Sequence, residues 1–594
     1  MKLAPRRLLT IAIALLVLVL PLLPVPEFWI TQLNLIGLYS IVALGLVLLT
    51  GVGGLTSFGQ AAFVGVGAYS TAVLTTQFAL SPWLGLLAGV VITVAIALVL
   101  AALTLRMSGH YLPLATIAWG LSLSYTMANV EGLGRYDGLL GIPALHLFGI
   151  SLHDGRRMYL LIWAVALLAA LATQRLLDSR PGRAIRALKG GAAMAEAMGI
   201  STYRYKVVIF VCAAVLAAIS GWLFAHYQRA VNPTPFGLNR GIEYLFMAVL
   251  GGIGQVGGAF VGAGAVKLIE DKLQEWLPLL TGTNGNYEVI VFGVLIVLVL
   301  KYAPDGLWPA VSRLLERWLP LARRVIDWAH AARLPERGRP QAGNVLLQVQ
   351  SVRKEFGGLV AVNDVSFELR AGEIVGLIGP NGAGKSTTFN LLTGTLALTR
   401  GSATFAGHTI AGLPARAIAR LGVSRTFQHV KLLPEMTVLE NVALGAHQRG
   451  RRGVLSAMLR TDRDEERRFF AEAQRQLERI GMGAQLHELA GNLPLGPQRL
   501  LEIARALCTD PVLLLLDEPA AGLRLQEKQA LADLLRRLRE EGLAVLLVEH
   551  DMDFVMSLVD RVAVIVFGEK VAEGLPAEVQ AHPKVREAYL GAEL

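Results

Sequence analysis

The sequence predicts an α-helical domain that crosses a membrane many times, followed by an α/β domain with a phosphate loop. Its 594 residues exceed the ~250–300 at which a single hydrophobic core stops growing. Apolar stretches of membrane-spanning length fill most of residues 1–305. From residue 345 onward, short aliphatic strands alternate with helical patterns, and "GPNGAGKST" (379–387) lies between one such strand and a helix.

The composition supports the membrane assignment. Hydrophobic residues make up 54% of the chain and charged residues 17%, below the ~25% of ordinary soluble proteins. The formal net charge of +10 accompanies the apolar spans, so we expect contact with a lipid bilayer and no nucleic acid. Two cysteines, Cys212 and Cys508, exclude a disulfide scaffold.

The first apolar run has a basic start with Lys2, Arg6 and Arg7, as a signal peptide would. No small-residue cleavage pattern follows and further spans do, so we expect a retained first helix. The predicted spanning runs are 8–25, 32–51, 57–77, 83–105, 111–128, 157–177, 207–226, 241–275 and 287–303.

The basic loop 178–206 orients these spans, because positively charged loops stay in the cytoplasm. We expect the N-terminus and the α/β domain on the same cytoplasmic side, which requires an even number of spans. The run 241–275 is interrupted by "GGIGQVGG" (251–258), where it divides into two short helices. The predicted total is about ten spans in a cytoplasmic membrane.

Residues 306–344 form the predicted junction between the domains 1–305 and 345–594. Trp308, Trp318 and Trp328, interleaved with arginines, are typical of an amphipathic segment at the lipid headgroups. A solvated helical spacer is the alternative. "PERGRPQAGN" (335–344) is typical of a flexible linker.

The phosphate loop follows a hydrophobic strand and opens a helix, which is the context that this pattern requires. Glycines 379, 382 and 384 let backbone N–H groups close around phosphates, with the helix N-terminus behind them. Lys385 then reaches the β- and γ-phosphates, and the Ser386 hydroxyl binds Mg²⁺.

Two carboxylates follow the buried strand of "PVLLLLDEP" (511–519). At the carboxyl end of a parallel strand, Asp517 is placed to hold Mg²⁺, and Glu518 to activate a water for attack on the γ-phosphate. A further strand in "GLAVLLVEHDM" (542–552) brings His550 to the same sheet edge, where it is placed to contact the γ-phosphate. A structural histidine is the alternative for this position.

Residues from about 347 onward resemble the ATPase subunit of ATP-binding cassette (ABC) transporters. The resemblance implies an ATP hydrolase that uses ATP and Mg²⁺, with Gln428 as the loop glutamine that senses Mg²⁺, Glu518 as catalytic base and His550 as switch histidine. It implies that Phe356 stacks on adenine, with a core residue as the alternative. Ala520–Leu523 matches the dimer-contact loop. The implied Walker A residues are Gly379, Pro380, Asn381, Gly382, Ala383, Gly384, Lys385, Ser386 and Thr387.

One motif departs from the family. "NLPLGPQRLLEIARAL" (492–507) occupies the place of the signature sequence, usually close to Leu-Ser-Gly-Gly-Gln. Leu493 and Gly496 fit, and Gln498 stands one place late. Pro494 stands in place of the serine, Leu495 in place of a glycine and Pro497 in place of the glutamine. The loss of the serine removes a hydroxyl donor, and the two prolines add two fixed φ angles. We expect the family to tolerate these substitutions; an impaired site is the alternative.

The membrane half resembles the permeases of branched-chain amino acid ABC importers over most of residues 30–305. The shared stretches are "GLTSFGQAAFVGVGAY" (54–69), "GRYDGLLGIP" (134–143), "SRPGRAIRAL" (179–188) and "LFMAVLGGIGQVGGAFVGA" (245–263). "AAMAEAMGI" (192–200) looks like the coupling helix that docks on an ATPase near the glutamine loop; a plain surface helix is the alternative.

Together the resemblances imply ATP-driven import of branched-chain, hydrophobic amino acids by a fused permease and ATPase. They imply as partners a second permease, a second ATPase and an extracytoplasmic substrate-binding protein; a homodimer is an alternative. Alternative cargoes within the family are urea, short amides and other amino acids. An ABC exporter is disfavoured, because exporters of that kind have six long spans that extend far into the cytoplasm. A nucleotide sensor without hydrolysis is disfavoured by Glu518 and His550.

Overall fold

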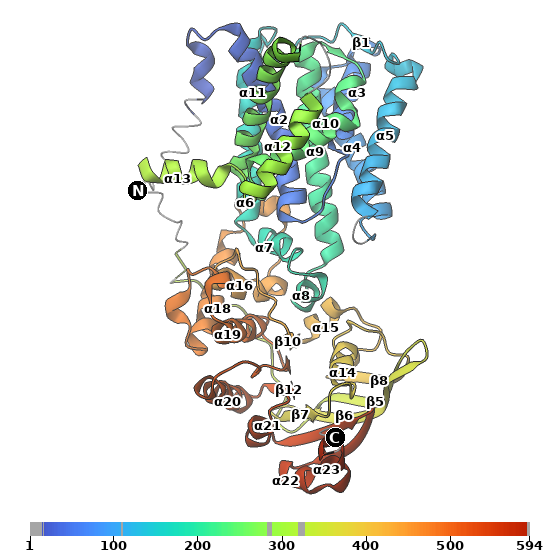
Figure 1. Cartoon of the computed structure of the whole chain (residues 1–594), viewed down its shortest axis with the longest axis vertical. Coiled ribbons are helices and arrows are strands. Elements are labelled where there is room, and N and C mark those ends of the chain that lie inside the picture. Colours follow the sequence, from blue (N-terminus) through green and yellow to red (C-terminus); the bar gives the residue numbers. More distant parts are fainter. Residues whose placement is uncertain are drawn as a thin grey trace. The chain divides into compact units, whose positions relative to one another are not determined.

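The computed structural model describes residues 15, 17–107, 111–281, 288–318, 327–328 and 330–590. By its internal contacts the chain divides into two units. The membrane unit comprises 1–178 and 203–325, and the ATPase unit comprises 179–202 and 326–594. The loop 179–202, which lies between two membrane-unit helices in the sequence, therefore packs with the second unit. Figure 1 shows the elements of each unit.

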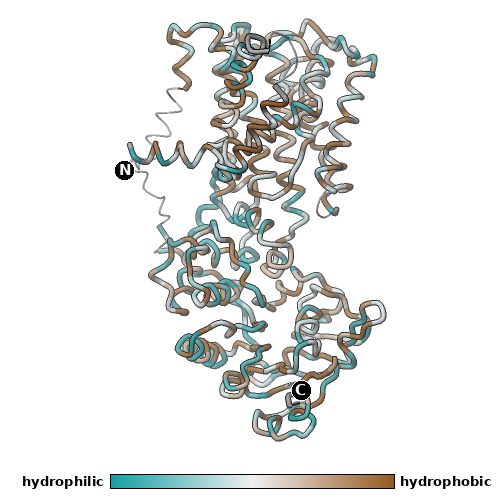
Figure 2. Tube along the Cα trace, viewed as in Figure 1, coloured by the Kyte–Doolittle hydropathy of each residue, from teal (hydrophilic) through white to brown (hydrophobic). Residues whose placement is uncertain are grey.

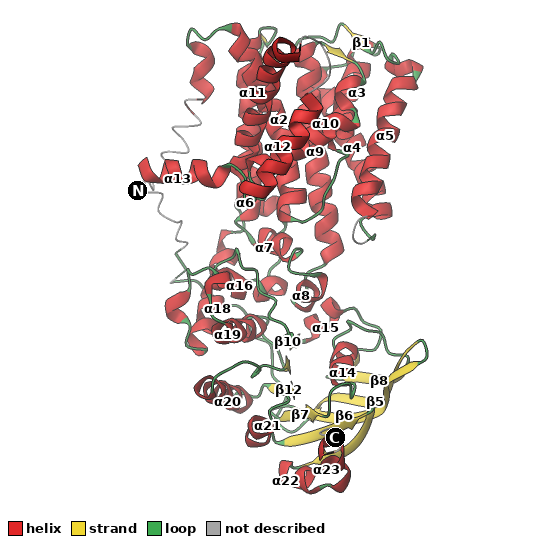
Figure 3. Ribbon diagram, viewed as in Figure 1, coloured by secondary structure: helices red, strands yellow, loops and turns green. Residues whose placement is uncertain are grey.

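The membrane unit is a bundle of long helices (Figure 3), and Figure 2 shows that hydrophobic residues dominate them. Two-residue strands pair β1 (Leu139–Leu140) with β4 (Ala230–Val231) and β2 (His146–Leu147) with β3 (Ile150–Ser151). The main helices are α2 (Glu27–Leu46), α3 (Gln60–Thr76), α4 (Pro82–Thr104), α5 (Tyr111–Asn129), α6 (Gly155–Leu177), α9 (Thr202–Gln228), α10 (Leu238–Gly251), α11 (Val256–Thr281), α12 (Glu288–Tyr302) and α13 (Trp308–Trp318).

Four helices of the described residues are long and apolar enough to cross a membrane by length and composition: Glu27–Val52, Pro82–Thr104, Gly155–Leu177 and Thr202–Gln228. Residues 8–14 and 16 of the predicted first run, 8–25, lie outside the described residues, and Leu20–Leu22 form a short 3-10 helix. The run 241–275 does divide in two, but only α10 is short, because α11 continues for 26 residues. The total of about ten spans therefore stays a prediction.

The predicted run 32–51 is longer than expected and irregular at its end. Its helix begins at Glu27, and its last six residues, Val47–Val52, form the π-helix η2. A glycine permits a close backbone approach there: a Cβ added to Gly51 would lie 2.5 Å from the Gly254 nitrogen, in the break between α10 and α11. Two helix interruptions far apart in sequence therefore face each other inside the membrane unit.

The ATPase unit contains a six-stranded sheet in the order β10–β11–β12–β7–β13–β14. Neighbours are parallel from β10 to β13, and β14 is antiparallel. Parallel strands buried on both faces need continuous apolar runs, which "LLLLD" and "AVLLV" supply. The strands are β10 (Val423–Arg425), β11 (Leu513–Asp517), β12 (Ala544–Val548), β7 (Ile374–Ile378), β13 (Arg561–Val566) and β14 (Glu569–Gly574).

A second, antiparallel sheet packs beside the first in the order β6–β5–β8–β9. Its strands are β6 (Leu359–Arg370), β5 (Val345–Phe356), β8 (Arg400–Phe405) and β9 (His408–Thr409). The helices of this unit are α7 (Arg180–Ala187), α8 (Ala192–Ala197), α14 (Lys385–Leu392), α15 (Ala415–Leu421), α16 (Val438–Ala443), α17 (Val454–Leu459), α18 (Arg463–Arg479), α19 (Leu495–Leu507), α20 (Leu525–Glu540), α21 (Met552–Leu558), α22 (Pro576–Ala581) and α23 (Pro583–Leu590).

The predicted junction differs from expectation in two ways. Among the described residues of the junction, the amphipathic helix is confined to Trp308–Trp318. Trp328 packs on Phe470 of the ATPase unit, with ring centroids 5.7 Å apart, instead of lying at lipid headgroups. The segment 335–344 has no regular structure, but it is held along its length. The Arg337 N–H donates to Asp510 at 2.5 Å, and Arg339 donates to the Pro511 carbonyl at 3.3 Å.

Candidate functional site

The phosphate loop lies between β7 and α14, as its sequence context predicts. Gly382 and Gly384 have φ values of 79° and 99°, which L side chains rarely adopt. A Cβ on Gly384 would lie 2.5 Å from the Ala361 carbonyl oxygen. Lys385 folds back over the loop and donates to the carbonyls of Gly379 (2.6 Å) and Pro380 (2.9 Å). The lysine is therefore held at the mouth of the loop, where phosphates would bind.

Asp517 ends β11 and is 4% exposed. Its backbone N–H donates to Thr426 Oγ1 at 3.3 Å, while its Oδ1 is buried without a hydrogen-bond partner. Burial raises the pKa of this carboxyl, and Arg425 opposes that shift. A carboxylate oxygen left unpaired in the interior fits a role as ligand for a cation.

These residues fit Mg²⁺, with Ser386 exposed beside the loop and Gln428 near the same edge. The described residues contain no group of three or more His, Cys, Asp or Glu side chains that would hold a metal by themselves. Mg²⁺ in phosphate sites takes one or two carboxylates plus phosphate oxygens, so such a cage is not required.

Two predicted residues, His550 and Gln428, converge on the carboxylate of a third, Glu518. His550 Nε2 lies 2.9 Å from Glu518 Oε1, and Gln428 Nε2 donates to the same oxygen at 3.1 Å. Glu518 has a φ of 49°, and its N–H donates to the Val548 carbonyl at 2.8 Å, which holds this uncommon conformation in place. A carboxylate oriented by two side chains at the end of β11 is suited to take a proton from a water.

Phe356 ends β5 and is 44% exposed, which is unusual for a large aromatic residue that serves only the core. The Lys354 ammonium lies 4.9 Å from its ring centroid. An exposed ring of this kind is available to stack on a base.

The signature segment caps α19. Pro494 is its N-cap residue and, unlike a serine, forms no side-chain cap. The Gln498 side chain donates to the Leu493 carbonyl at 2.7 Å, so it stabilises the start of its own helix. Leu493 and Gly496 are buried, and a Cβ on Gly496 would lie 2.6 Å from Glu527 Oε1. Leu495 is 49% exposed.

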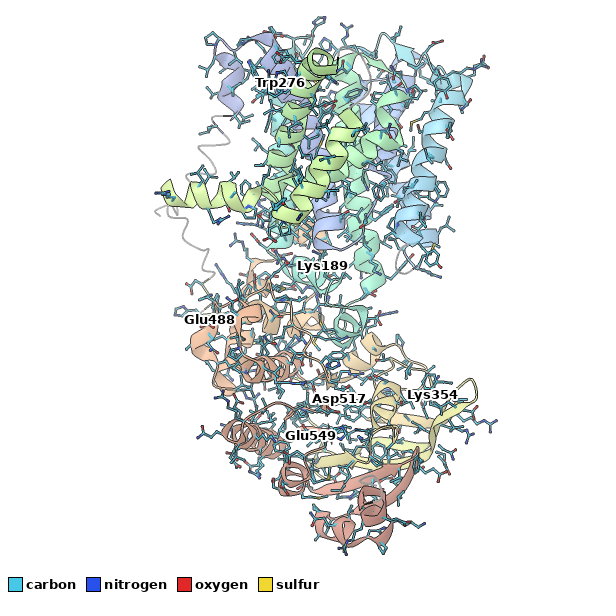
Figure 4. The ribbon with its side chains drawn as sticks, viewed as in Figure 1. Lys189, Trp276, Lys354, Glu488, Asp517 and Glu549 are labelled. Atoms are coloured by element: carbon cyan, nitrogen blue, oxygen red, sulfur yellow. The ribbon has the colours of Figure 1, made fainter. Side chains whose placement is uncertain are left out.

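Sequence reasoning missed Glu549, which is 3% exposed and directly precedes His550. Its Oε1 accepts the Ala520 N–H at 2.6 Å and its Oε2 accepts the His550 N–H at 3.1 Å. It therefore ties the loop Ala520–Leu523 to the residue that contacts Glu518. Figure 4 labels Glu549 and Asp517 at this edge of the sheet, where β11 pairs with β12. The position of Glu549 directly after a buried strand was the sequence signal that could have identified it.

Comparison with protein families divides the chain in the same way. A family model described as the permease component of branched-chain amino acid transport systems matches residues 29–300. The ABC transporter model matches residues 362–521. A model described as a branched-chain amino acid ATP-binding cassette transporter matches residues 569–594.

Curated relatives match the second half of the chain. The high-affinity branched-chain amino acid transport ATP-binding protein LivG of Salmonella typhimurium is 48% identical over 249 residues, covering 41% of this chain and 98% of LivG. BraF of Pseudomonas aeruginosa, with the same described role, is 43% identical over 249 residues, covering 41% of this chain and 98% of BraF. A crystal structure of a nucleotide-free ATP-binding cassette from an ABC transporter is 32% identical over 41% of this chain and 99% of that chain, with a TM-score of 0.38.

Proposed function

Because this chain belongs to the branched-chain amino acid ABC transporter family, we propose that it imports branched-chain, hydrophobic amino acids, driven by ATP hydrolysis in its own second half. The observation that carries the proposal is that one chain combines a permease and an ATPase. Residues 29–300 match the permease model, and in the ATPase unit Gln428 and His550 contact Glu518. A permease joined to an ATPase has the parts that energised transport requires.

The ATP site is built around the phosphate loop. The loop N–H groups and Lys385 bind the phosphates, and Phe356 stacks on the adenine. Asp517, Ser386 and Gln428 would hold Mg²⁺, which supplies charge neutralisation at the phosphates. Glu518 takes the proton of the attacking water, and His550 keeps the carboxylate oriented through its 2.9 Å contact.

In the ABC arrangement each ATP lies between one ATPase's phosphate loop and the other's signature segment. Leu493, Gly496 and Gln498 then contact the partner's ATP. With Pro494 as N-cap, this contact depends on the backbone N–H groups at the start of α19, because the serine hydroxyl is absent.

For the membrane half we propose about ten spans in a cytoplasmic membrane, within domain borders 1–305, 306–344 and 345–594. The N-terminus and the ATPase unit lie on the cytoplasmic side, as the basic loop 178–206 indicates. One permease and one ATPase form half of such an importer. The proposed partners are a second permease, a second ATPase and an extracytoplasmic substrate-binding protein.

Competition during uptake tests the cargo. Cells that carry the chain and its partners take up labelled leucine, and we expect excess valine to block this uptake and excess urea to leave it unchanged. Blocking by urea and not by valine would transfer the cargo assignment to urea or short amides.

The adenine contact gives a separate prediction. Phe356→Ala should raise the KM for ATP about tenfold, because base–aromatic stacking contributes about 1–3 kcal/mol. Phe356→Trp is the matched control and should keep the native KM, since it retains a stacking face. The measurement is the ATP dependence of hydrolysis by the purified chain. An unchanged KM in the alanine variant would leave Phe356 with a structural role only.

A further inference from the structure

The ATPase unit contains two segments that connect it along the chain to the membrane unit. The first is the loop 179–202, which follows α6 and precedes most of α9. The second is the linker, of which 327–328 and 330–344 are described. Both segments contact the same helix, α18, in the ATPase unit.

The loop contacts α18 through a buried ion pair. Arg183 Nη1 lies 2.7 Å from Glu466 Oε2, and the two side chains are 2% and 5% exposed. The Arg183 guanidinium also lies 4.9 Å from the ring centroid of Phe470. The Arg180 N–H donates to Glu466 Oε1 at 2.6 Å. The loop therefore satisfies both oxygens of one buried carboxylate.

A second set of bonds fixes the same loop. The Arg180 guanidinium donates to the carbonyls of His447 (2.7 Å), Gly450 (3.0 Å) and Arg452. Three convergent carbonyls match the fork of an arginine better than the single ammonium of a lysine. The loop 179–202 is thus held by ion pairing and by hydrogen-bond geometry. Its residues Met194 and Ala195, in α8, are fully buried.

The linker contacts α18 one and two turns further on. The Trp328 and Phe470 ring centroids are 5.7 Å apart, and Trp328 Nε1 donates to Gln474 Oε1. Arg475 pairs with Glu336 at 2.9 Å. Leu334 is 5% exposed within the apolar cluster that includes Phe470. Linker and loop therefore share Phe470 as a common neighbour.

Glu466, Phe470 and Gln474 are four residues apart, so they form one stripe along α18, here termed the docking stripe. We propose that the docking stripe makes this ATPase specific for its own permease. The loop of each chain docks in cis, and the Arg183–Glu466 pair is the specificity-determining contact. This inference rests on the proposed transport function.

One physical effect supports docking in cis, and a second supports specificity for this loop. The linker holds its own ATPase unit close to the loop, which raises the effective concentration above that of a separate subunit. The buried Glu466 carboxylate is costly without a cation, so the stripe rejects a permease loop that lacks an arginine at this position. The second ATPase of the assembly is then left to the second permease.

Charge reversal tests the pair in the assembled transporter. Arg183→Glu and Glu466→Arg each place like charges together, so we expect uptake per ATP hydrolysed to fall at least about tenfold. The double variant restores the opposite charges and should recover most of that loss. Arg536→Glu, at the exposed pair with Asp533, is the matched control and should keep native coupling. Native coupling in both single variants would overturn the proposal.

Cross-linking tests the cis geometry without any cargo. Arg183→Cys and Glu466→Cys are introduced together with Cys212→Ser and Cys508→Ala, and the membranes are treated with a short bis-maleimide. We expect a 183–466 linked peptide from a product of single-chain mass. A product containing a second copy or another ATPase, or no 183–466 peptide, would overturn docking in cis. Failure of leucine uptake by the native chain would instead reject the transport function and leave this result intact.

Discussion

Glu518→Gln should lower ATP turnover by about 10²- to 10⁴-fold, the contribution typical of a general base. The amide keeps the shape of the side chain but cannot accept the proton of the attacking water. The contacts of Oε1 with Gln428 (3.1 Å) and His550 (2.9 Å) show that this carboxylate is held at the end of β11. ATP binding should persist, because the phosphates are bound by the loop and Lys385.

The measurement is phosphate release by the purified full chain, together with binding of a fluorescent ATP analogue. Glu540→Gln, an exposed position on α20, is the matched control and should turn over ATP at the native rate. Native turnover in Glu518→Gln would remove Glu518 from the role of base. Loss of nucleotide binding in the same variant would assign it to the binding site instead.

Arg505→Met should lower the free energy of local unfolding of α19 by about 3–5 kcal/mol, the range for breaking a buried ion pair. Arg505 and Glu502 pair at 3.0 Å and are 2% and 1% exposed. The pair holds the backbone of Lys431, whose N–H donates to Glu502 at 2.8 Å and whose carbonyl accepts from Arg505 at 2.7 Å. Burial already raises the pKa of Glu502, so loss of its cation leaves the carboxylate strongly disfavoured.

Hydrogen exchange measures this opening without assuming that the whole chain unfolds in two states. Amides of α19 and of Lys431 should exchange about two to three orders of magnitude faster in Arg505→Met. Arg536→Met, at the exposed pair with Asp533, should leave exchange within about threefold of native. Equal exchange in the two variants would contradict a stabilising role for the buried pair.

Local sequence patterns predicted the strand, loop and helix around the phosphate loop, because this part of the fold depends on short segments. The strand β7, the glycines after it and α14 follow one another in the sequence. Placement of Asp517 and Glu518 at a strand end follows from the leucine run alone. The roles of Gln428 and Phe356 came from family resemblance, since nothing in their immediate neighbours indicates a nucleotide.

Contacts between distant segments could not be predicted in this way. Arg180 and Arg183 indicated only a cytoplasmic loop, whereas the structure buries Arg183 against Glu466, 283 residues away. Trp328 fitted a membrane interface by composition, and its packing on Phe470 appears only in the folded chain. The π-helix at Val47–Val52 includes Gly51, whose backbone closely approaches Gly254. Such features depend on which elements meet, and single-sequence patterns do not encode that.

The central claim is tested most directly by uptake of labelled leucine into vesicles that contain the assembled transporter. The ATPase units face the vesicle interior, where ATP is enclosed. The native chain should accumulate leucine above the outside concentration, and Glu518→Gln should abolish that accumulation while still binding ATP. Undiminished accumulation by Glu518→Gln would contradict the account, because transport would then not depend on hydrolysis in this chain.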